Sequence, residues 1–447
     1  MTFDKHSLAS GTMLAAAILL LVFAAACGGG SSSSSNSSSN SGNSSSSSSA
    51  PSAACGSSTS NCAVLTVNAG PTGGYVNGAF VDVTVCGTSC TTVSSVLVDT
   101  GSVGLRVLKS AVSGIGLTQS TATGGGALVE CYPFVASYMW GPVATAKVEI
   151  AGETASSTPI MLVDDSTTPA FAVPSACSNY GGTALTATNT QASLGANGIL
   201  GIGNTQQDCG GSCALSVSQQ TDSSGFYGLY YACSSSSSCT GTAVSTAAQV
   251  PNPVSRFTAD NNGTVISLPS ISSSGAVSLA GALYFGIGTQ SNNAMPSAAT
   301  VLALDPTYEQ FITTSYKSTT NTQSYIDSGS NGYFFDDSTI PACSSNSVAG
   351  SDWFCPSSTL TLSATNSGST GSSGSNTASF SIANTDTLFN NNGGADYVFN
   401  DLGGPGSTGT FDWGLPFFFG RAVYNGIELK QATNSAGTAF VGPFVAY

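Results

Sequence analysis

The chain has 447 residues, only 7% of them charged, and a formal net charge of −14 at pH 7. Nucleic acid is excluded as a partner, because phosphate binding needs clusters of Lys and Arg and the sequence has none. The single histidine, His6, lies in a segment that we expect to be removed. Ser-His-Asp or Cys-His catalysis and His-ligated metal sites are therefore excluded as well. Acid–base chemistry must come from carboxylates, Tyr, Lys or Cys.

The N-terminus carries an uninterrupted apolar run, residues 13–26, preceded by Lys5. This run is shorter than the roughly 20 residues that a membrane-spanning helix needs, and it predicts a signal peptide over residues 1–26. Its ending, AAAC, resembles the lipobox of bacterial lipoproteins, which implies lipidation of Cys27; the alternative is ordinary cleavage nearby, with Cys27 incidental. Because Gly28 rather than Asp follows, we expect a lipid-anchored protein of the bacterial cell envelope, in the outer membrane.

The segment after Cys27 consists almost entirely of Ser, Gly and Asn as far as Pro51. Such a segment has no apolar surface to bury and cannot offset the entropy of becoming ordered. We therefore expect residues 27–62 to form a flexible tether.

The cysteines support export. Of the 13 cysteines, all except Cys27 fall into pairs of sequence neighbours. Sequence does not prove connectivity, but short-range pairing is the simplest interpretation in an exported chain. The predicted disulfides are Cys55–Cys62, Cys86–Cys90, Cys131–Cys177, Cys209–Cys213, Cys233–Cys239 and Cys343–Cys355.

Beyond the tether the chain consists of short apolar or alternating runs separated by turns rich in Gly, Asn and Ser. This pattern is typical of an all-β protein, and the length favours more than one lobe. The best helix candidate is Pro306–Tyr316, and it is short. The predicted strands include Val81–Val85, Val96–Val98, Lys147–Ile150, Pro159–Val163, Leu283–Phe285 and Leu360–Leu362.

One pattern occurs twice in the same order. VLVDTGSVGLRVL, residues 96–108, is followed by Ile199-Leu200-Gly201, and SYIDSGSNGYFF, residues 324–335, is followed by Phe418-Phe419-Gly420. Each copy is an apolar run, then Asp-Thr/Ser-Gly-Ser, then two apolar residues and Gly. Duplication on this scale indicates two related lobes, which we place at residues 63–248 and 249–447.

The duplicated pattern resembles the pepsin-like aspartic peptidases over nearly all of residues 63–447. The resemblance implies an all-β, bilobal double β-barrel with an interlobe cleft, in which each lobe contributes one Asp and one apolar-apolar-Gly strand passes close to each Asp loop. The C-terminal run FDWGLPFFFGRAVYNGIE is similar, in addition, to an uncharacterised family of proteobacterial lipoproteins.

The residues of the two loops suit this chemistry. An apolar run ending in Asp99 or Asp327 places a carboxylate where desolvation opposes its ionisation, and two carboxyls in contact share one proton. Gly101 and Gly329 let the two loops approach closely. Ser102 and Ser330 can donate hydrogen bonds to the outer oxygens of the two aspartates. The resemblance implies that Thr100 and Ser328 form hydrogen bonds across to the opposite loop.

The hairpin expected to cover the cleft departs from the family pattern. The family has a Tyr beside a Gly-rich tip, whereas the matching stretch, residues 131–150, places Phe134 there. Tyr138 or Tyr132 can take the role if the hairpin is remodelled, and Trp140 can fill the same space. These aromatic residues are equally compatible with the core of the hairpin.

Two functions fit the sequence. The first is a membrane-tethered aspartic endopeptidase that hydrolyses peptide bonds through Asp99, Asp327 and a shared water. The alternative is an inactive pepsin-fold module that binds a peptide or serves in adhesion at the cell envelope. In either case we expect a monomer with a polypeptide in the cleft, a lipid anchor, and neither cofactor nor metal.

Overall fold

The computed structural model describes residues 55, 60–223, 225–307, 309–369 and 374–447. The predicted signal peptide, the lipidation site Cys27 and most of the tether lie outside the described residues. Among the described residues, no helix combines the length and the apolar character needed to cross a membrane.

The elements run in chain order as follows. The strands of the first half are β1 (Cys62–Asn68), β2 (Gly78–Cys86), β3 (Cys90–Asp99), β4 (Val103–Leu108), β5 (Thr118–Gln119), β6 (Ala127–Pro133), β7 (Ser137–Ile150), β8 (Glu153–Val163), β9 (Thr186–Ala187), β10 (Gly198–Ile202), β11 (Thr221–Asp222), β12 (Gly225–Phe226), β13 (Tyr230–Ser235) and β14 (Ser238–Gly241). Those of the second half are β15 (Gly263–Leu268), β16 (Leu279–Phe285), β17 (Val301–Ala303), β18 (Ile312–Tyr316), β19 (Thr319–Ile326), β20 (Tyr333–Phe335), β21 (Leu360–Ser367), β22 (Ser375–Ile382), β23 (Gly403–Pro405), β24 (Phe411–Trp413), β25 (Arg421–Gly426), β26 (Gln431–Thr433), β27 (Ala439–Val441) and β28 (Phe444–Ala446). The helices are short: α2 (Ser175–Ser178), α3 (Gln191–Leu194), α4 (Gly210–Ala214) and α5 (Thr385–Asn390), with 3-10 turns η1 (Lys109–Val112), η2 (Tyr180–Gly182), η3 (Val217–Gln220), η4 (Thr246–Ala248), η5 (Pro253–Arg256), η6 (Asn391–Gly394) and η7 (Leu415–Phe418).

The first lobe is a closed barrel. β2 pairs with β3, β3 with β10, β10 with β4, β4 with β8, β8 with β7, and β7 returns to β2. Side chains alternate between the inside and the outside of this barrel: Val83 and Val85 of β2 are fully buried, whereas Asp82 of the same strand is exposed. The N-terminal half of β7 extends beyond the barrel and pairs with β6, which continues the outer layer through β13 to β14.

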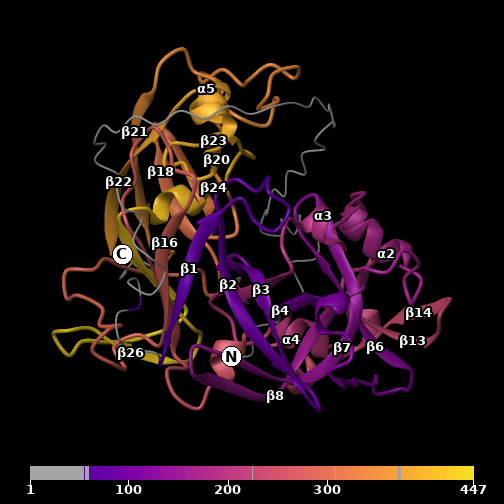
Figure 1. Ribbon diagram of the computed structural model, residues 1–447. Coiled ribbons are helices and arrows are strands. Elements are labelled where there is room, and N and C mark those ends of the chain that lie inside the picture. Colours follow the sequence, from indigo (N-terminus) through magenta and orange to yellow (C-terminus); the bar gives the residue numbers. More distant parts are fainter. Residues whose placement is uncertain (1–54, 56–59, 224, 308, 370–373) are drawn as a thin grey trace, which may run out of the picture.

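The second lobe is an open sheet in the order β22-β21-β18-β19-β24-β20-β23. In Figure 1 it forms the orange and yellow part of the molecule, opposite the purple first lobe. Between the lobes, β1 pairs with both β2 and β16, and the sheet continues through β15, β25, β28 and β17. A continuous sheet therefore joins the two lobes, and the predicted all-β, bilobal fold class is confirmed.

The two Asp loops occupy matching places in their lobes. β10 runs parallel to β3 and antiparallel to β4, with Gly201 opposite Asp99. β24 likewise runs parallel to β19 and antiparallel to β20, with Trp413 opposite Ile326. The residue in register with Asp327 is therefore Gly414, which follows β24.

The prediction that Phe418-Phe419-Gly420 is the partner strand of Asp327 is wrong. A Cβ on Gly414 would lie 2.1 Å from the carbonyl oxygen of Gly332, so the close approach requires glycine there. The N–H of Gly420 instead donates a hydrogen bond to the carbonyl of Leu268, the last residue of β15 in the interlobe sheet. The sequence contains two glycines after apolar residues within one run, and only the pairing of β24 distinguishes them.

Of the other local predictions, those of strands and disulfides are confirmed and that of a helix is wrong. Each of the six predicted strands lies within an observed strand, and the structure contains the six disulfides in the predicted pairing. The helix predicted over Pro306–Tyr316 is wrong, because Ile312–Tyr316 form β18. Thr313 and Thr314 there are β-branched, and β18 lies between β19 and β21, whose hydrogen bonds decide its structure.

Candidate active site

The two aspartates of the duplicated motif meet between the lobes. Asp99 is the last residue of β3, and Asp327 directly follows β19. The backbone N–H of Gly101 donates to Oδ1 of Asp99 at 2.8 Å and lies 3.1 Å from Oδ1 of Asp327. Each carboxyl influences the pKa of the other, and both aspartates are fully buried. The chain thus brings one carboxyl from each lobe to a single N–H.

The glycines of the two loops make this contact possible. A Cβ on Gly101 would lie 2.7 Å from Cγ of Asp327, and a Cβ on Gly329 would lie 2.6 Å from Oδ1 of Asp99. Either side chain would displace the carboxyl of the opposite lobe.

Thr100 and Ser328 link the loops symmetrically. The Thr100 N–H donates to Oγ of Ser328 at 3.1 Å, and the Ser328 N–H donates to Oγ1 of Thr100 at 2.9 Å. Each hydroxyl donates in turn to a backbone carbonyl of the opposite lobe, that of Ile326 or Val98. These four buried hydrogen bonds fix the relative position of the two aspartates.

The outer carboxyl oxygens are held by the serines that follow. Ser102 donates to Oδ2 of Asp99, and Ser330 donates to Oδ2 of Asp327 at 2.8 Å. The structure thus brings the eight residues of the two Asp-Thr/Ser-Gly-Ser motifs together at one place.

The two carboxyls are electrostatically unequal. Burial raises the pKa of Asp99, but hydrogen bonds from Ser102, Asp327 and Gly101 and the positive charge of Arg106 act in the opposite direction. The pKa of Asp327 is raised well above its usual value, first by burial and then by the negative charge of Asp99. Arg106 therefore favours the ionised form of Asp99, burial and the charge of Asp99 favour the neutral form of Asp327, and the pair shares one proton.

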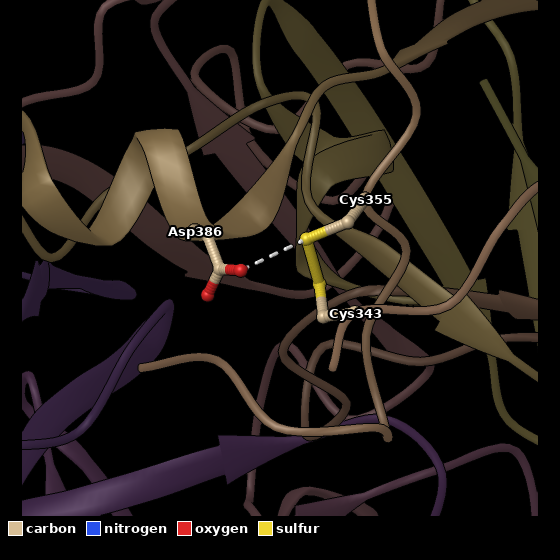
Figure 2. Close-up of side chains that lie close together, drawn as sticks. All are labelled: Cys343, Cys355 and Asp386. Atoms are coloured by element: carbon tan, nitrogen blue, oxygen red, sulfur yellow. Dashed lines mark hydrogen bonds between the residues drawn. A yellow bond between two sulfur atoms is a disulfide. The ribbon is translucent and has the colours of Figure 1, made fainter. Parts of the chain in front are cut away.

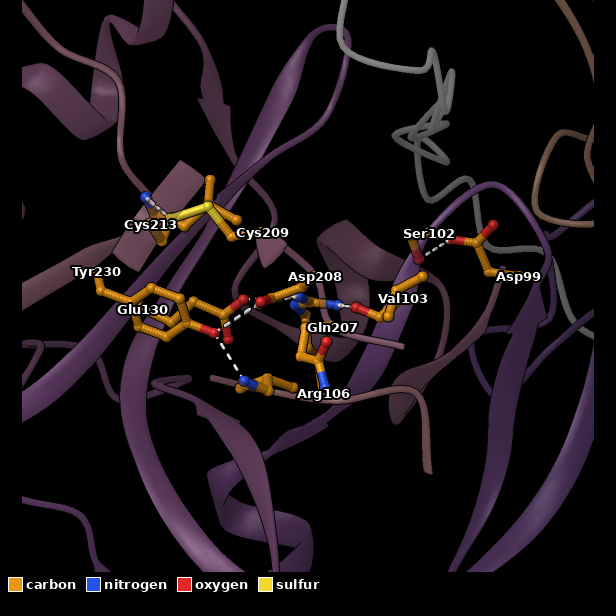
Figure 3. A network of polar contacts seen from close by, with 12 residues as sticks. Asp99, Ser102, Val103, Arg106, Glu130, Gln207, Asp208, Cys209, Cys213 and Tyr230 are labelled. Carbon is orange, nitrogen blue, oxygen red and sulfur yellow. Dashed lines mark hydrogen bonds and ion pairs between the residues drawn. A yellow bond between two sulfur atoms is a disulfide. The ribbon is translucent and has the colours of Figure 1, made fainter. Parts of the chain in front are cut away.

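A buried polar cluster, which we call the Arg106 cluster, lies beside Asp99 (Figure 3). Nη2 of Arg106 contacts Glu130 at 2.6 Å and Asp208 at 3.2 Å, and all three side chains have no exposed surface. The Tyr230 hydroxyl donates to Asp208 at 2.8 Å and accepts the N–H of Val250. Burial, followed by the charge of Glu130, raises the pKa of Asp208 well above its usual value. One guanidinium thus faces two fully buried carboxyls.

The aromatic residues considered for the flap divide between the core of the first lobe and the neighbourhood of Arg106. Phe134, Tyr138 and Trp140 lie in the hydrophobic core of the first lobe, and the Trp140 indole donates to the carbonyl of Phe171. Tyr132 lies instead under the guanidinium of Arg106, whose Cζ is 3.5 Å from the ring centroid.

The charge of the dyad contributes to the raised pKa of two tyrosine phenols. Burial raises the pKa of Tyr132, and the negative charge of Asp99 is among the further causes. Burial also raises the pKa of Tyr75, from the loop between β1 and β2, and the charges of both Asp99 and Asp327 add to this. These two tyrosines, from different loops, are the aromatic groups whose titration the dyad influences.

Sequence reasoning missed a third carboxyl. Asp412 of β24 is 2% exposed, and its pKa is raised well above the usual value by burial and then by the charge of Asp327. Asp412 and Arg106 share a signal that was available: each is a single charged residue within an apolar run, FDWGL and GLRVL.

A cavity lies next to the dyad, lined from both lobes. It is bounded on one side by Thr100, Gly101 and Asn204 and on the other by Leu304, Ile312 and Tyr325. Gly101, whose N–H contacts both aspartates, forms part of the wall of this cavity.

One cluster among the described residues has the spacing of a metal site, Cys343, Cys355 and Asp386 (Figure 2). The two sulfurs form a disulfide, so neither is a thiolate that can bind a metal ion. Asp386 lies in the first turn of α5, and its Oδ1 accepts a hydrogen bond from the backbone N–H of Ala349. The cluster is a disulfide beside a helix N-terminus.

The fold and the site together define a class: a two-lobed all-β protein with one buried aspartate from each lobe in contact. Residues 57–447 match the family described as "Protein of unknown function (DUF3443)", and the chain belongs to this family. No curated protein is similar in sequence. Among solved structures, the chain is similar to an aspartic proteinase from Irpex lacteus, with 16% identity and a TM-score of 0.46 over 86% of this chain and 96% of that one.

Proposed function

We propose that this protein is an aspartic-type endopeptidase. The observation that carries the proposal is the contact of two buried carboxyls, one from each lobe, at the N–H of Gly101. The serine, threonine and glycine contacts around them are those needed to hold two carboxyls together at one reacting centre.

The different surroundings of the two carboxyls suggest which one is the general base and which the general acid. Asp99, whose ionised form is favoured by Arg106 and three hydrogen bonds, takes a proton from a water held between the two carboxyls. The resulting hydroxide adds to the peptide carbonyl carbon, while Asp327 gives its proton to the carbonyl oxygen. Asp99 then passes its proton to the amide nitrogen as the C–N bond breaks, and Asp327 recovers its proton from the new carboxyl group.

Access to the dyad requires movement. Both aspartates are fully buried, whereas Tyr75 and Tyr132 are partly exposed. We propose that the segments carrying these two tyrosines cover the dyad and open for a polypeptide in extended conformation, which enters along the cavity beside Gly101.

We also propose the predicted location, a lipid anchor at Cys27 in the bacterial outer membrane. The AAAC sequence, the tether and the six disulfides support export. Labelling of the protein with a radioactive fatty acid, and its loss in Cys27→Ala, checks the anchor.

The test of the activity is cleavage of a denatured protein substrate between pH 3 and 8. Wild type should cleave in acid and lose activity as pH rises through the pKa of Asp327, because the dyad works only while one carboxyl is protonated. Asp99→Asn and Asp327→Asn should each abolish cleavage, whereas Asp82→Asn, a substitution on the exposed face of β2, should leave it unchanged.

Two results would contradict the proposal. Cleavage that survives either dyad substitution would exclude the aspartic mechanism. Absence of cleavage by wild type at every pH, together with retained binding of a statine-type peptide, would assign the cleft to peptide binding.

A further inference from the structure

The Arg106 cluster joins the strand that follows the Asp99 loop to the hairpin formed by β6 and β7. Arg106 lies in β4, whereas Glu130 and Tyr132 lie two residues apart in β6, close to the hairpin turn. Nη2 of Arg106 is 2.6 Å from Oε1 of Glu130, and Cζ of Arg106 is 3.5 Å from the centroid of the Tyr132 ring. One guanidinium therefore contacts the hairpin twice, through an ion pair and through the face of an aromatic ring.

The guanidinium is also held by groups outside the hairpin. Its Nη1 donates to the carbonyl of Val103 at 2.7 Å, and its Nη2 contacts Asp208 at 3.2 Å (Figure 3). Asp208 accepts a hydrogen bond from the Tyr230 hydroxyl at 2.8 Å, and that hydroxyl accepts one from the N–H of Val250 at 2.7 Å. These contacts fix the guanidinium independently of the hairpin turn.

The contact between Arg106 and Tyr132 lies on the face of the sheet that carries Asp99. Gly201 of β10 is in register with Asp99 on one side and with Gly104 of β4 on the other, so the three residues share one face. A Cβ on Gly104 would lie 3.3 Å from Nη1 of Arg106, which places the guanidinium beside Gly104 on that face. Two strand spacings, about 10 Å in all, separate Gly104 from Asp99. The ring of Tyr132 is therefore held on the Asp99 side of the dyad.

Packing does not explain an arginine at this position. Arg106 and Phe334 lie at the same distance in sequence after Asp99 and Asp327, the aspartates of the two loops. Phe334 is buried in an apolar cluster, so the second lobe is built with an apolar side chain at the matching place. A buried ion pair is often no more stabilising than well-packed apolar side chains of similar volume. The contact with Tyr132 gives the arginine a role that an apolar side chain does not fill.

We propose that Arg106 is a positioning residue that holds the β6–β7 hairpin closed on the Asp99 side of the dyad by binding the ring of Tyr132. The ion pair with Glu130 fixes β6 at that residue, so the part of the hairpin that opens begins at Tyr132. Entry of a polypeptide separates the ring from the guanidinium, and return of the ring closes the hairpin on the polypeptide. The role in cleavage rests on the proposed function, whereas the restraint of the hairpin does not.

The test separates the ring of Tyr132 from its hydroxyl. Tyr132→Leu removes the ring that the guanidinium contacts, whereas Tyr132→Phe keeps a ring and is the matched control. Arg106→Lys removes the planar guanidinium but keeps a positive charge beside Glu130 and Asp208, so the buried carboxyls retain a counter-ion. The double variant, Tyr132→Leu with Arg106→Lys, shows whether the two substitutions remove the same contact.

Hydrogen exchange of backbone amides in the purified protein measures the opening of the hairpin. The N–H of Phe134 donates to the carbonyl of Ser137 at 2.7 Å and so closes the turn. We expect this amide to exchange about tenfold faster in Tyr132→Leu, in Arg106→Lys and in the double variant, since a partly buried cation–π contact has about this strength. Tyr132→Phe should exchange at the wild-type rate, and the amides of β2 and β3 should keep their rates in every variant.

Three results would overturn the inference. The first is wild-type exchange of the turn in Tyr132→Leu. The second is equal acceleration in Tyr132→Leu and Tyr132→Phe, because the hydroxyl rather than the ring would then hold the hairpin. The third is acceleration that extends through β2 and β3, which would reduce Arg106 to a structural residue. The two Tyr132 variants decide the outcome even if Arg106→Lys does not fold.

Steady-state kinetics test the role of the hairpin in cleavage. Arg106→Lys should raise KM for a denatured protein substrate several-fold, because the hairpin no longer closes on the polypeptide, and should keep the wild-type pH profile, because a positive charge remains near Asp99. An unchanged KM would overturn the role in cleavage. Absence of cleavage by wild type, together with the expected exchange rates, would contradict the proposed function and still support the restraint of the hairpin by Arg106.

Discussion

Arg106→Met tests whether the Arg106 cluster stabilises the first lobe by charge. Methionine keeps much of the apolar stem but removes the guanidinium, which contacts Glu130 at 2.6 Å, Asp208 at 3.2 Å and the carbonyl of Val103 at 2.7 Å. The substitution leaves two carboxyls in contact without a counter-ion, in a place with no exposed surface.

The magnitude follows from that burial. Removing one partner of a fully buried ion pair costs about 3–5 kcal/mol, because the remaining charge is left desolvated. For residues 57–447, with an unfolding entropy of about 2 cal/mol/K per residue, this lowers the unfolding temperature by about 4–6 °C. The loss should shrink as pH falls, because a carboxylate left buried without its counter-ion is neutralised in acid.

Calorimetry at pH 8, 6 and 4 measures this dependence. Arg421→Met is the matched control, because the Arg421 guanidinium contacts the carbonyl and the ring of Phe417 and makes no ion pair with a described residue. We expect Arg421→Met to lower the unfolding temperature by a smaller amount that does not change with pH. A loss in Arg106→Met that is equally small, or is constant from pH 8 to 4, would refute the assignment of the effect to buried charge.

Two further predictions concern the pH response and the cover of the dyad. Burial raises the pKa of Asp401 to about 6 and, with Asp260 nearby, that of Glu153 to about 7. The stabilising contribution of these two carboxyls is complete below about pH 4 and is lost as pH rises through 6–7. Calorimetry should therefore give a higher unfolding temperature at pH 5 than at pH 8. An equal or lower value at pH 5 would contradict this prediction. Tyr132→Phe should reduce kcat for peptide cleavage several-fold, since the pKa of the Tyr132 phenol is influenced by Asp99. Tyr138→Phe, a substitution in the core, should leave kcat unchanged. Equal effects of the two substitutions in steady-state kinetics would exclude Tyr132 from the site.

The sequence alone determined what local patterns encode. Alternating and apolar runs separated by Gly and Asn predicted β-strands such as Val81–Val85, because burial on one face of a strand follows a period of two residues. Close spacing of cysteines predicted the disulfides, since pairs such as Cys86 and Cys90 flank a single turn. The two Asp-Thr/Ser-Gly-Ser loops placed Asp99 and Asp327 at equivalent positions, because every group that holds each carboxyl within its own lobe lies within three residues of it.

The tertiary structure decided everything that depends on residues distant in the chain. Ile312–Tyr316 became a strand because two neighbouring strands supply its hydrogen bonds, and Gly414 rather than Gly420 met Asp327 because β24 pairs with β19. Arg106 and Asp412 read in the sequence as isolated charges in apolar runs. Their positions near Asp99 and Asp327 arise only when the strands pair, since no local spacing relates Arg106 to Asp208 or Asp412 to Asp327.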